Sequence, residues 1–401
     1  MYDFEKLLKR NENGSKKWNV KYIRERFGVD LEKNFYPMFI ADMDFRLPEN
    51  ILKSILNLVE CNFDLGYFDI RDETFESIVN WYKNNYNCLI DRRWILPSIG
   101  VISLIGFSIN RILNKGDRVL IFTPAYGPFK DVLLNNEMKP IYENLLLEDC
   151  RYFIDFKNLE NNIVKNEVRV IMFCNPHNPS GRCWSKQELE QLVNMCKRHD
   201  ILIISDEVHG DISINENKFI SLSSYMDVYD KIIVMSSPNK TFNVAGLNIS
   251  FLVCKNDFIR NEIDKSLHDK KIHVNRFSIE CLTLFYKDGY IWVNELKKCI
   301  RENIKIATDI ISEVSSISII QPDAGYLLWV KLNLVEDIDD FVLQLAKNKN
   351  VLLESGSRFI NNYQKFLRIN VATSKKLLSE GLKLFVDFYK QYVNEKEIYQ
   401  E

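Results

Sequence analysis

A lysine in a hydroxyl-rich turn is the most promising reactive side chain of the sequence. Lys240 lies in the stretch Ser236–Leu247, which follows the apolar, β-branched run Lys231–Met235. Such a run is typical of a short buried strand, and open α/β sheets bind ligands at the carboxyl ends of their strands. A lysine at that edge can lose hydration and form a Schiff base with an aldehyde cofactor. The alternative is a solvated surface lysine, so the prediction depends on what accompanies Lys240.

Asp206 is a candidate partner for a cationic cofactor ring. It comes directly after the apolar run Ile201–Ile204 and Ser205. A carboxylate at the end of a buried strand is costly unless it is paired, and a protonated ring nitrogen is one such partner. The alternative is an aspartate that caps a helix N-terminus.

Asn178 and Tyr126 follow two further strand candidates. Asn178 lies in the turn Asn175–Gly181, where two Asn-Pro pairs surround His177. Because this turn is too rigid for a generic loop, we expect a positioned amide at Asn178, and we interpret His177 as a turn residue. Tyr126 follows Thr-Pro-Ala and is placed either to stack on a cofactor ring or to fill the core.

Three features suit anionic groups. Ser237 precedes Lys240 by three positions and is close enough to reach a phosphate. The turn Pro97–Gly100 leads into an apolar helix, whose free N–H groups also suit a phosphate. Arg368 lies within the apolar strand candidate Phe366–Val371, where an arginine needs a partner. That partner is a substrate carboxylate, which arginine binds with two hydrogen bonds, or an internal salt bridge.

Alternating strands and helices must position these residues. Near-continuous apolar strands between helices predict an α/β fold, with a mostly parallel sheet covered by helices on both faces. The polar residues above then converge on one cleft. Strands are expected at 118–123, 168–174, 201–204, 231–235 and 249–254, and helices at 49–61, 72–85, 101–110 and 185–199. The last helix begins with a capping box of Ser185 and Glu188.

The pattern of expected helices and strands changes past about residue 285. A long helix at 290–315 is followed by strand candidates at 317–320, 326–332 and 366–371 and by helices at 337–348 and 375–392. This pattern predicts a smaller α+β domain. We therefore divide the chain into a large cofactor-binding domain, 49–285, and a small domain formed by 1–48 and 286–401. Within the small domain, Phe39–Phe45 is expected to be a strand that ends in a turn.

Composition narrows the class of protein. A length of 401 residues favours two domains, and the net charge of -2 gives no footprint for nucleic acid. The sequence predicts neither a membrane span nor a signal peptide. Nine cysteines without a CxxC pair and five histidines show no metal-ligand spacing. We expect a cytoplasmic protein with reduced cysteines and no metal site.

At this point a family resemblance is evident. The order of the candidate residues resembles that of the fold-type I pyridoxal-phosphate enzymes, aminotransferase class I/II, and several motifs are similar to the MalY/PatB group of cystathionine β-lyases and cysteine-S-conjugate C–S lyases. His209 lies three positions after Asp206. A histidine at this position is similar to the C–S lyase group, whereas ordinary aminotransferases usually have a tyrosine there. The similar motifs are Phe39–Phe45, Cys174–Gly181, Ser205–His209, Lys240–Gly246 and Arg368–Asn370.

The resemblance implies an aspartate aminotransferase-like fold and pyridoxal 5'-phosphate as the cofactor. It makes Lys240 the residue that binds the cofactor aldehyde and moves the Cα proton, and Asp206 the partner of the pyridine nitrogen. It places Asn178 and His209 near the phenolate oxygen of the cofactor, with Asn178 also near the substrate. Arg368 then binds the substrate carboxylate.

The resemblance also implies a homodimer with active sites at the subunit interface. Tyr67 is expected to reach the phosphate of the neighbouring subunit, and Tyr126 to stack on the cofactor ring. The residues implied to hold the phosphate are Gly100, Val101, Ile102 and Ser237.

Some positions depart from the family pattern. Asn239 stands where the group usually has a serine before the lysine. The other departures are Phe68 after Gly66-Tyr67, the segments Trp81–Tyr86 and Phe359–Asn362, and the turn Asp323–Tyr326. These changes bear on substrate choice and phosphate affinity and leave the central residues intact.

The activity that we predict is β-elimination from an S-substituted cysteine, which yields a thiol, pyruvate and ammonia. The runner-up is an aminotransferase, which needs a keto acid for turnover. A non-catalytic regulator or binding protein on the same fold is an alternative of another class. Such regulators usually carry an added DNA-binding domain, and residues 1–48 show no helix-turn-helix pattern and no basic cluster.

Overall fold

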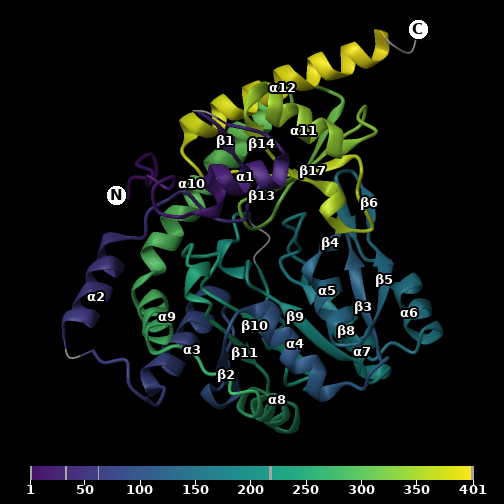
Figure 1. Cartoon of the computed structure of the whole chain (residues 1–401). Helices are drawn as coiled ribbons and strands as arrows, with labels where there is room; N and C mark the ends of the chain where they lie inside the picture. Colours follow the sequence, from purple (N-terminus) through teal and green to yellow (C-terminus); the bar gives the residue numbers. More distant parts are fainter. Residues whose placement is uncertain (1, 32–33, 62, 216–218, 399–401) are drawn as a thin grey trace.

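A seven-stranded, mostly parallel sheet forms the centre of the larger part of the protein (Figure 1). The structure is a computed structural model that describes residues 2–31, 34–61, 63–215 and 219–398. The strand order is β2-β11-β10-β9-β8-β3-β5, and only β11 runs antiparallel to both of its neighbours. The α/β prediction is thereby confirmed. The strands are β2 (Ile95–Ser98), β3 (Arg118–Thr123), β5 (Lys139–Asn144), β8 (Val170–Cys174), β9 (Leu202–Asp206), β10 (Ile232–Ser236) and β11 (Ser250–Val253).

Side chains alternate between the two faces of this sheet, and helices bury both faces. In β9, Leu202 and Ile204 pack into one hydrophobic cluster and Ile203 into another, as the two-residue period of a strand requires. The first face is covered by α4 (Val101–Ile112), α5 (Pro128–Asn135) and α8 (Asp257–Asp269). The second is covered by α3 (Asp72–Tyr86), α6 (Phe156–Lys165), α7 (Lys186–Arg198) and α9 (Arg276–Asp288).

A second, four-stranded antiparallel sheet has the order β12-β13-β17-β15 and packs with three helices (Figure 1). Its strands are β12 (Ile317–Ile320), β13 (Leu327–Leu332), β15 (Glu354–Ser355) and β17 (Phe366–Asn370), and the helices are α10 (Tyr290–Ile311), α11 (Ile338–Lys349) and α12 (Lys375–Ile398). All of these elements lie within 286–401, whereas the seven-stranded sheet lies within 49–285. The placement of the domain boundary itself stays a proposal.

Two short strand pairs join distant parts of the chain. β1 (Tyr36–Pro37) runs parallel to β14 (Val351–Leu352), and this pair holds the N-terminal region against the C-terminal part. β4 (Ala125–Tyr126) pairs antiparallel with β16 (Phe359–Ile360). The second pair joins Tyr126, three residues after β3, to the C-terminal part of the chain, which carries Arg368 in β17.

The strand predicted at Phe39–Phe45 was wrong, because extended pairing in this region is confined to Tyr36–Pro37. From Phe39 to Met43 every backbone carbonyl accepts a hydrogen bond from a side chain instead of continuing a strand ladder. The Asn370 amide donates to the carbonyls of Ile40 at 2.6 Å and Asp42 at 2.5 Å. The apolar pattern of the segment therefore reflects burial, and a run of apolar residues alone does not separate a strand from a buried loop.

The predicted helices are present, with small differences at their ends. α2 (Glu49–Glu60) and α7 match the expected ranges, and both hydrogen bonds of the capping box between Ser185 and Glu188 are formed. In the N-terminal region, η1 (Lys16–Trp18) leads into α1 (Val20–Phe27). Among the described residues, no helix combines the length and the apolar character needed to cross a membrane.

Candidate active site

A cavity of about 640 Å³ lies at the carboxyl edge of the seven-stranded sheet, within the range of ligand-binding pockets. Strand ends of this sheet form its inner part, and the strands and turns of the C-terminal part form the opposite wall. Six of the predicted site residues line it: Tyr126, Asn178, Asp206, His209, Lys240 and Arg368. The predicted convergence of polar residues on one cleft is therefore confirmed for these six.

Lys240 projects into the cavity from the turn that follows β10. Its Nζ donates a hydrogen bond of 2.7 Å to the carbonyl oxygen of Ala41. Burial, assisted by the nearby charge of Arg368, lowers the pKa of Lys240 to about 8, while the carboxylates of Asp42 and Asp206 oppose this shift. The lowered pKa increases the fraction of unprotonated amine near neutral pH, and the unprotonated amine is the form that attacks a carbonyl or takes a proton.

Asp206 is the last residue of β9, and only 8% of it is exposed. One carboxylate oxygen accepts a hydrogen bond of 3.1 Å from the backbone N–H of Val208. Burial raises the pKa of Asp206 to about 6, against the opposing effects of this N–H and of Lys240. A buried carboxylate with so few partners is suited to bind a cationic group of a ligand.

Arg368 lies in the middle of β17, opposite Glu354 of β15, and it is buried. Its Nη1 donates to Asn178 Oδ1 at 3.3 Å and its Nη2 to the carbonyl of Phe39 at 3.4 Å. Both bonds are long, and the buried Nε has no acceptor among the described residues. Burial lowers the pKa of this guanidinium, so an anionic ligand would stabilise its charge.

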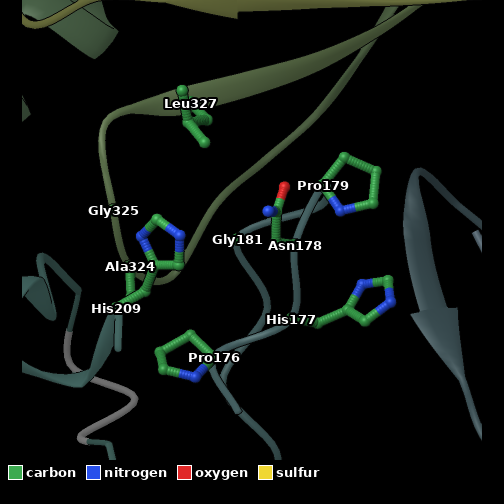
Figure 2. A pocket seen from close by; sticks show the side chains of 9 residues that line it. All are labelled: Pro176, His177, Asn178, Pro179, Gly181, His209, Ala324, Gly325 and Leu327. Atoms are coloured by element: carbon green, nitrogen blue, oxygen red, sulfur yellow. The ribbon is translucent and has the colours of Figure 1, made fainter. Parts of the chain in front are cut away.

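Asn178 and His209 lie at one end of the cavity, beside a small pocket (Figure 2). Burial, reinforced by Lys240 and Arg368, lowers the pKa of His209 to about 3, so its ring is neutral near physiological pH. His177 turns away from His209 (Figure 2). Its ring nitrogens bond Ser180 Oγ at 2.7 Å and the Pro124 carbonyl at 2.9 Å, which fits the interpretation of His177 as a turn residue.

Tyr126 is 39% exposed at the cavity wall, with its ring edge-on to that of Phe129. Burial of its hydroxyl raises the pKa of Tyr126, so the side chain is neutral. An aromatic face open to the cavity is compatible with stacking against a flat ligand, which stays a prediction.

The four residues predicted to hold a phosphate do not line this cavity. Gly100 precedes α4 with a φ of 43°, and a Cβ there would lie 2.7 Å from Asn248 Oδ1. Val101 and Ile102 begin α4, where backbone N–H groups have no acceptor within the helix. The buried Ser237 hydroxyl donates to the Ile249 carbonyl and accepts from the Asn239 N–H. Phosphate binding by Gly100, Val101, Ile102 and Ser237 therefore stays a prediction, and Ser237 would have to exchange a bond to contribute.

Tyr67 lies outside the cavity. Its side chain is fully exposed, in a turn after α2. This position agrees with a side chain that reaches out of its own chain, but the contact with a neighbouring subunit stays a prediction.

Sequence reasoning missed how the segment Phe39–Met43 contributes to the site. Its Ala41 carbonyl accepts hydrogen bonds from Lys240 and, at 3.2 Å, from the Tyr326 hydroxyl. Asn243 and Met43 form a reciprocal pair, with the Asn243 amide donating to the Met43 carbonyl at 2.6 Å and accepting from the Met43 N–H at 2.9 Å. Asn243 and Met43 each lie in a motif that resembles the family. The occurrence of both motifs in one chain was the signal that could have predicted this contact.

Several polar groups at the cavity have fewer partners in the described part of the chain than a buried charge needs. They are a desolvated amine at Lys240, a protonatable carboxylate at Asp206 and an unpaired guanidinium nitrogen at Arg368. The buried Asn239 Oδ1, one residue before the lysine, also has no partner. Buried polar groups of native proteins are normally hydrogen-bonded. This donor set fits a polar ligand that offers a carbonyl, a cationic ring nitrogen and an anionic group.

Comparisons with known proteins agree with this geometry. The family described as "Aminotransferase class I and II" matches residues 29–384. Cystathionine beta-lyase PatB of Bacillus subtilis (strain 168) is 30% identical over 386 residues, which cover 95% of this chain and 98% of that protein. Cystalysin from Treponema denticola, whose crystal structure contains a pyridoxal 5'-phosphate cofactor, superposes with a TM-score of 0.91 at 27% identity, covering 98% of this chain and 100% of that one. A PLP-bound C-S lyase from Staphylococcus hominis gives 0.86 at 27%, covering 97% and 98%.

Proposed function

The chain belongs to the aminotransferase class I and II family, and we propose that it is a pyridoxal-phosphate-dependent carbon–sulfur lyase. Its substrates are S-substituted cysteines, from which it releases a thiol, pyruvate and ammonia with the uptake of one water. The observation that supports this most is the single cavity that holds Lys240, Asp206 and Arg368. His209 agrees with the lyase group, because a neutral histidine occupies the position where aminotransferases usually have a tyrosine.

We propose that the site residues hold pyridoxal 5'-phosphate in this cavity. We assign Lys240 to the cofactor aldehyde, Asp206 to the ring nitrogen and Asn178 and His209 to the region of its phenolate oxygen. Tyr126 is assigned to the ring face, and Gly100, Val101, Ile102 and Ser237 to the phosphate. When bound, pyridoxal 5'-phosphate supplies an electron-poor ring that accepts the electron pair of the broken Cα–H bond.

The chain's own residues carry out the remaining steps. Arg368 binds the substrate carboxylate with its free donors, and Asn178 orients that guanidinium through Oδ1. The Lys240 amine, whose pKa of about 8 leaves it partly unprotonated, takes the Cα proton. The Asp206 carboxylate would pair with the cationic ring nitrogen of the bound cofactor. The sulfur of the substrate leaves from Cβ as a thiolate.

We also propose a homodimer. α2 and the turn that follows it expose apolar side chains, with Leu56 60%, Val59 54% and Leu65 77% exposed near the fully exposed Tyr67. Figure 1 shows α2 at the edge of the molecule. Clustered exposed apolar residues are typical of an interface, and a second copy would cover them and receive Tyr67. Sedimentation equilibrium tests this, since a monomer at micromolar concentration would contradict it.

A cytoplasmic location completes the proposal. All nine cysteines are free, as is usual in a reducing compartment.

The decisive experiment is incubation of the cofactor-loaded protein with L-cystathionine. We expect pyruvate and free thiol in equal amounts, measured with lactate dehydrogenase and with a thiol reagent. Absence of both products, with the cofactor absorbance intact, contradicts the lyase assignment. Turnover that appears only when a keto acid is added supports an aminotransferase instead, which the same Lys240, Asp206 and Arg368 could also serve.

A further inference from the structure

The outer part of the cavity carries charges that the proposed reaction does not use. Lys16 and Arg26 enter from the N-terminal region, Glu354 and Arg358 from the C-terminal part, and Asp131 from α5. They lie in the same cavity as Lys240 and Arg368, which are assigned to the reacting half of the substrate. These charges therefore line the same cavity as the part of the substrate that leaves from Cβ.

Two of the five charges neutralise each other. The Arg26 Nη2 donates to both carboxylate oxygens of Glu354, at 2.7 and 2.5 Å, and its Nη1 donates to the Tyr22 hydroxyl at 3.1 Å. Glu354 is only 7% exposed. A buried bidentate pair of this kind is a fixed part of the wall and has little capacity left for a charged ligand.

Two cations remain available. Arg358 lies 3.5 Å from Glu354 through its Nε, and its side chain is 55% exposed. Within the described ranges, the terminal nitrogens of Arg358 donate no hydrogen bond to an acidic side chain, and the exposed ammonium of Lys16 has no ion pair. Lys16 lies 5.9 Å from the centre of the Tyr22 ring, beside Arg26. The outer wall thus offers a guanidinium fork and an ammonium for an anion.

One anion remains available as well. Asp131 lies one turn into α5, with its N–H on the Gly127 carbonyl at 3.4 Å. Gly127 is close to the Arg358 backbone, because a Cβ on it would lie 3.0 Å from the Arg358 carbonyl oxygen. The Asp131 carboxylate is exposed and has no ion pair with any described residue. A cation and an anion are therefore presented from neighbouring parts of one wall.

We propose that this outer region is a subsite for the leaving half of the substrate, in which Arg358 and Lys16 bind a distal carboxylate and Asp131 binds a distal ammonium. The inference rests on the proposed lyase function and narrows its substrate. A thioether that joins two amino-acid ends, such as cystathionine, matches this charge pattern. An S-alkyl cysteine has no charges to offer to it.

Four substrates of equal chain length separate the two distal charges. L-cystathionine has both, S-(3-carboxypropyl)-L-cysteine only the carboxylate, S-(3-aminopropyl)-L-cysteine only the ammonium, and S-propyl-L-cysteine neither. We expect kcat/KM for pyruvate release to be about tenfold higher for cystathionine than for S-propyl-L-cysteine, the size of one charge-assisted hydrogen bond.

Variants assign the charges to residues. Arg358→Met should lower kcat/KM about five- to tenfold for the two carboxylate-bearing substrates and leave S-propyl-L-cysteine unchanged. Lys16→Met should act in the same direction with a smaller effect, and Arg358→Lys should restore part of the loss. Asp131→Asn should affect only the two ammonium-bearing substrates. Lys130→Met is the matched control, because Lys130 is an exposed neighbour of Asp131 that does not line the cavity.

Equal kcat/KM values for all four substrates would overturn the subsite, as would an Arg358→Met loss that is the same with S-propyl-L-cysteine. Pyruvate from none of the four would instead contradict the lyase function. In that case the dissociation constants of L-cystathionine and S-propyl-L-cysteine, measured from their effect on the cofactor absorbance, test the subsite directly. Equal constants would overturn it.

Discussion

Charged side chains are buried in two places along the segment Phe39–Asp44. In the first, which we name the ion-pair cluster, Arg10 and Lys17 meet Asp42 and Asp44. In the second, the active site, Lys240 donates to the Ala41 carbonyl of the same segment. The residue types are alike in the two places, and their chemical states differ.

In the ion-pair cluster every charge has opposite charges around it. Arg10 lies 2.5 Å from Asp42 and 2.9 Å from Asp44, and Lys17 lies 3.0 Å from Asp44. The Trp18 indole N–H adds a hydrogen bond of 2.8 Å to Asp44. Burial alone would raise the pKa of Asp44, but Lys17, Trp18 and Arg10 together hold it below its usual value. This cluster is complete without a ligand.

In the active site the shifts run the other way. Burial raises the pKa of Asp206 and lowers that of Lys240, because each has too few partners to hold its charge. The number of partners around each buried charge thus distinguishes a structural ion-pair cluster from a ligand-binding site. Matched substitutions in the two places should therefore change different properties.

The largest expected effect is the loss of activity in Lys240→Met. Removal of the base and of the cofactor's attachment should lower turnover about 10⁴-fold or more. The variant should also lose the visible absorbance of lysine-bound cofactor. Its cofactor-free form should unfold in urea at the same or a higher concentration than the wild type, because a desolvated amine is gone. Retained absorbance would refute the assignment of Lys240.

Lys17→Met, the same substitution in the ion-pair cluster, should act on stability. It leaves Asp44 fully buried with one cation fewer, which should lower the free energy of unfolding by about 3–5 kcal/mol. The folded fraction should keep its cofactor absorbance. Lys21→Met, at an exposed position on α1, is the control and should change stability by less than about 0.5 kcal/mol. A Lys17→Met effect as small as that would remove the contrast between the clusters.

The pH dependence of stability should show the same contrast in the cofactor-free protein. The folded pKa of Lys240, about 8, lies below the ordinary value of 10.5. Between these values the unfolded chain binds the extra proton, so stability rises with pH and the cost of the buried charge disappears. Wild type should gain about 1–3 kcal/mol relative to Lys240→Met between pH ~8 and ~10.5. Asp44 acts at the other end, because its contribution is lost as pH falls through its lowered pKa.

Urea unfolding of both proteins across this pH range provides the measurement. Parallel curves for wild type and Lys240→Met would show that the amine is not desolvated in the folded chain.

Sequence periodicity predicted five of the seven strands of the large sheet and missed β2 and β5, and it failed where partners are far apart in the chain. The apolar runs before Asp206 and Lys240 predicted strands and thereby placed both residues at one sheet edge. The segment Phe39–Phe45 has the same apolar appearance, yet its carbonyls are bound by side chains from residues about 200 to 330 positions away. Local patterns do not reveal such partners. The Arg26–Glu354 pair was missed for the same reason.

The smallest expected effect concerns a third way to hold a buried charge. Asp211, 3% exposed, accepts hydrogen bonds from three neutral donors: the Trp81 indole at 2.6 Å, the Thr241 hydroxyl at 2.5 Å and the Tyr86 hydroxyl. Thr241 directly follows Lys240, so this hydrogen bond anchors the turn that carries the reactive amine. Thr241→Val removes one donor of three and should cost about 1 kcal/mol of stability. Turnover should fall a few-fold, because the Lys240 amine is less well positioned.

Thr241→Ser, which keeps the hydroxyl, is the control and should retain the turnover of the wild type. The comparison with Lys17→Met then shows whether a neutral donor or a cation stabilises a buried carboxylate more. Loss of one neutral donor leaves Asp211 two hydrogen bonds, whereas loss of Lys17 removes a full charge from a carboxylate that is shielded from water. Equal destabilisation by Thr241→Val and Lys17→Met would show that neutral donors stabilise a buried carboxylate as strongly as cations do. The active site would then differ from the ion-pair cluster and from the surroundings of Asp211 only because its charged groups have fewer partners.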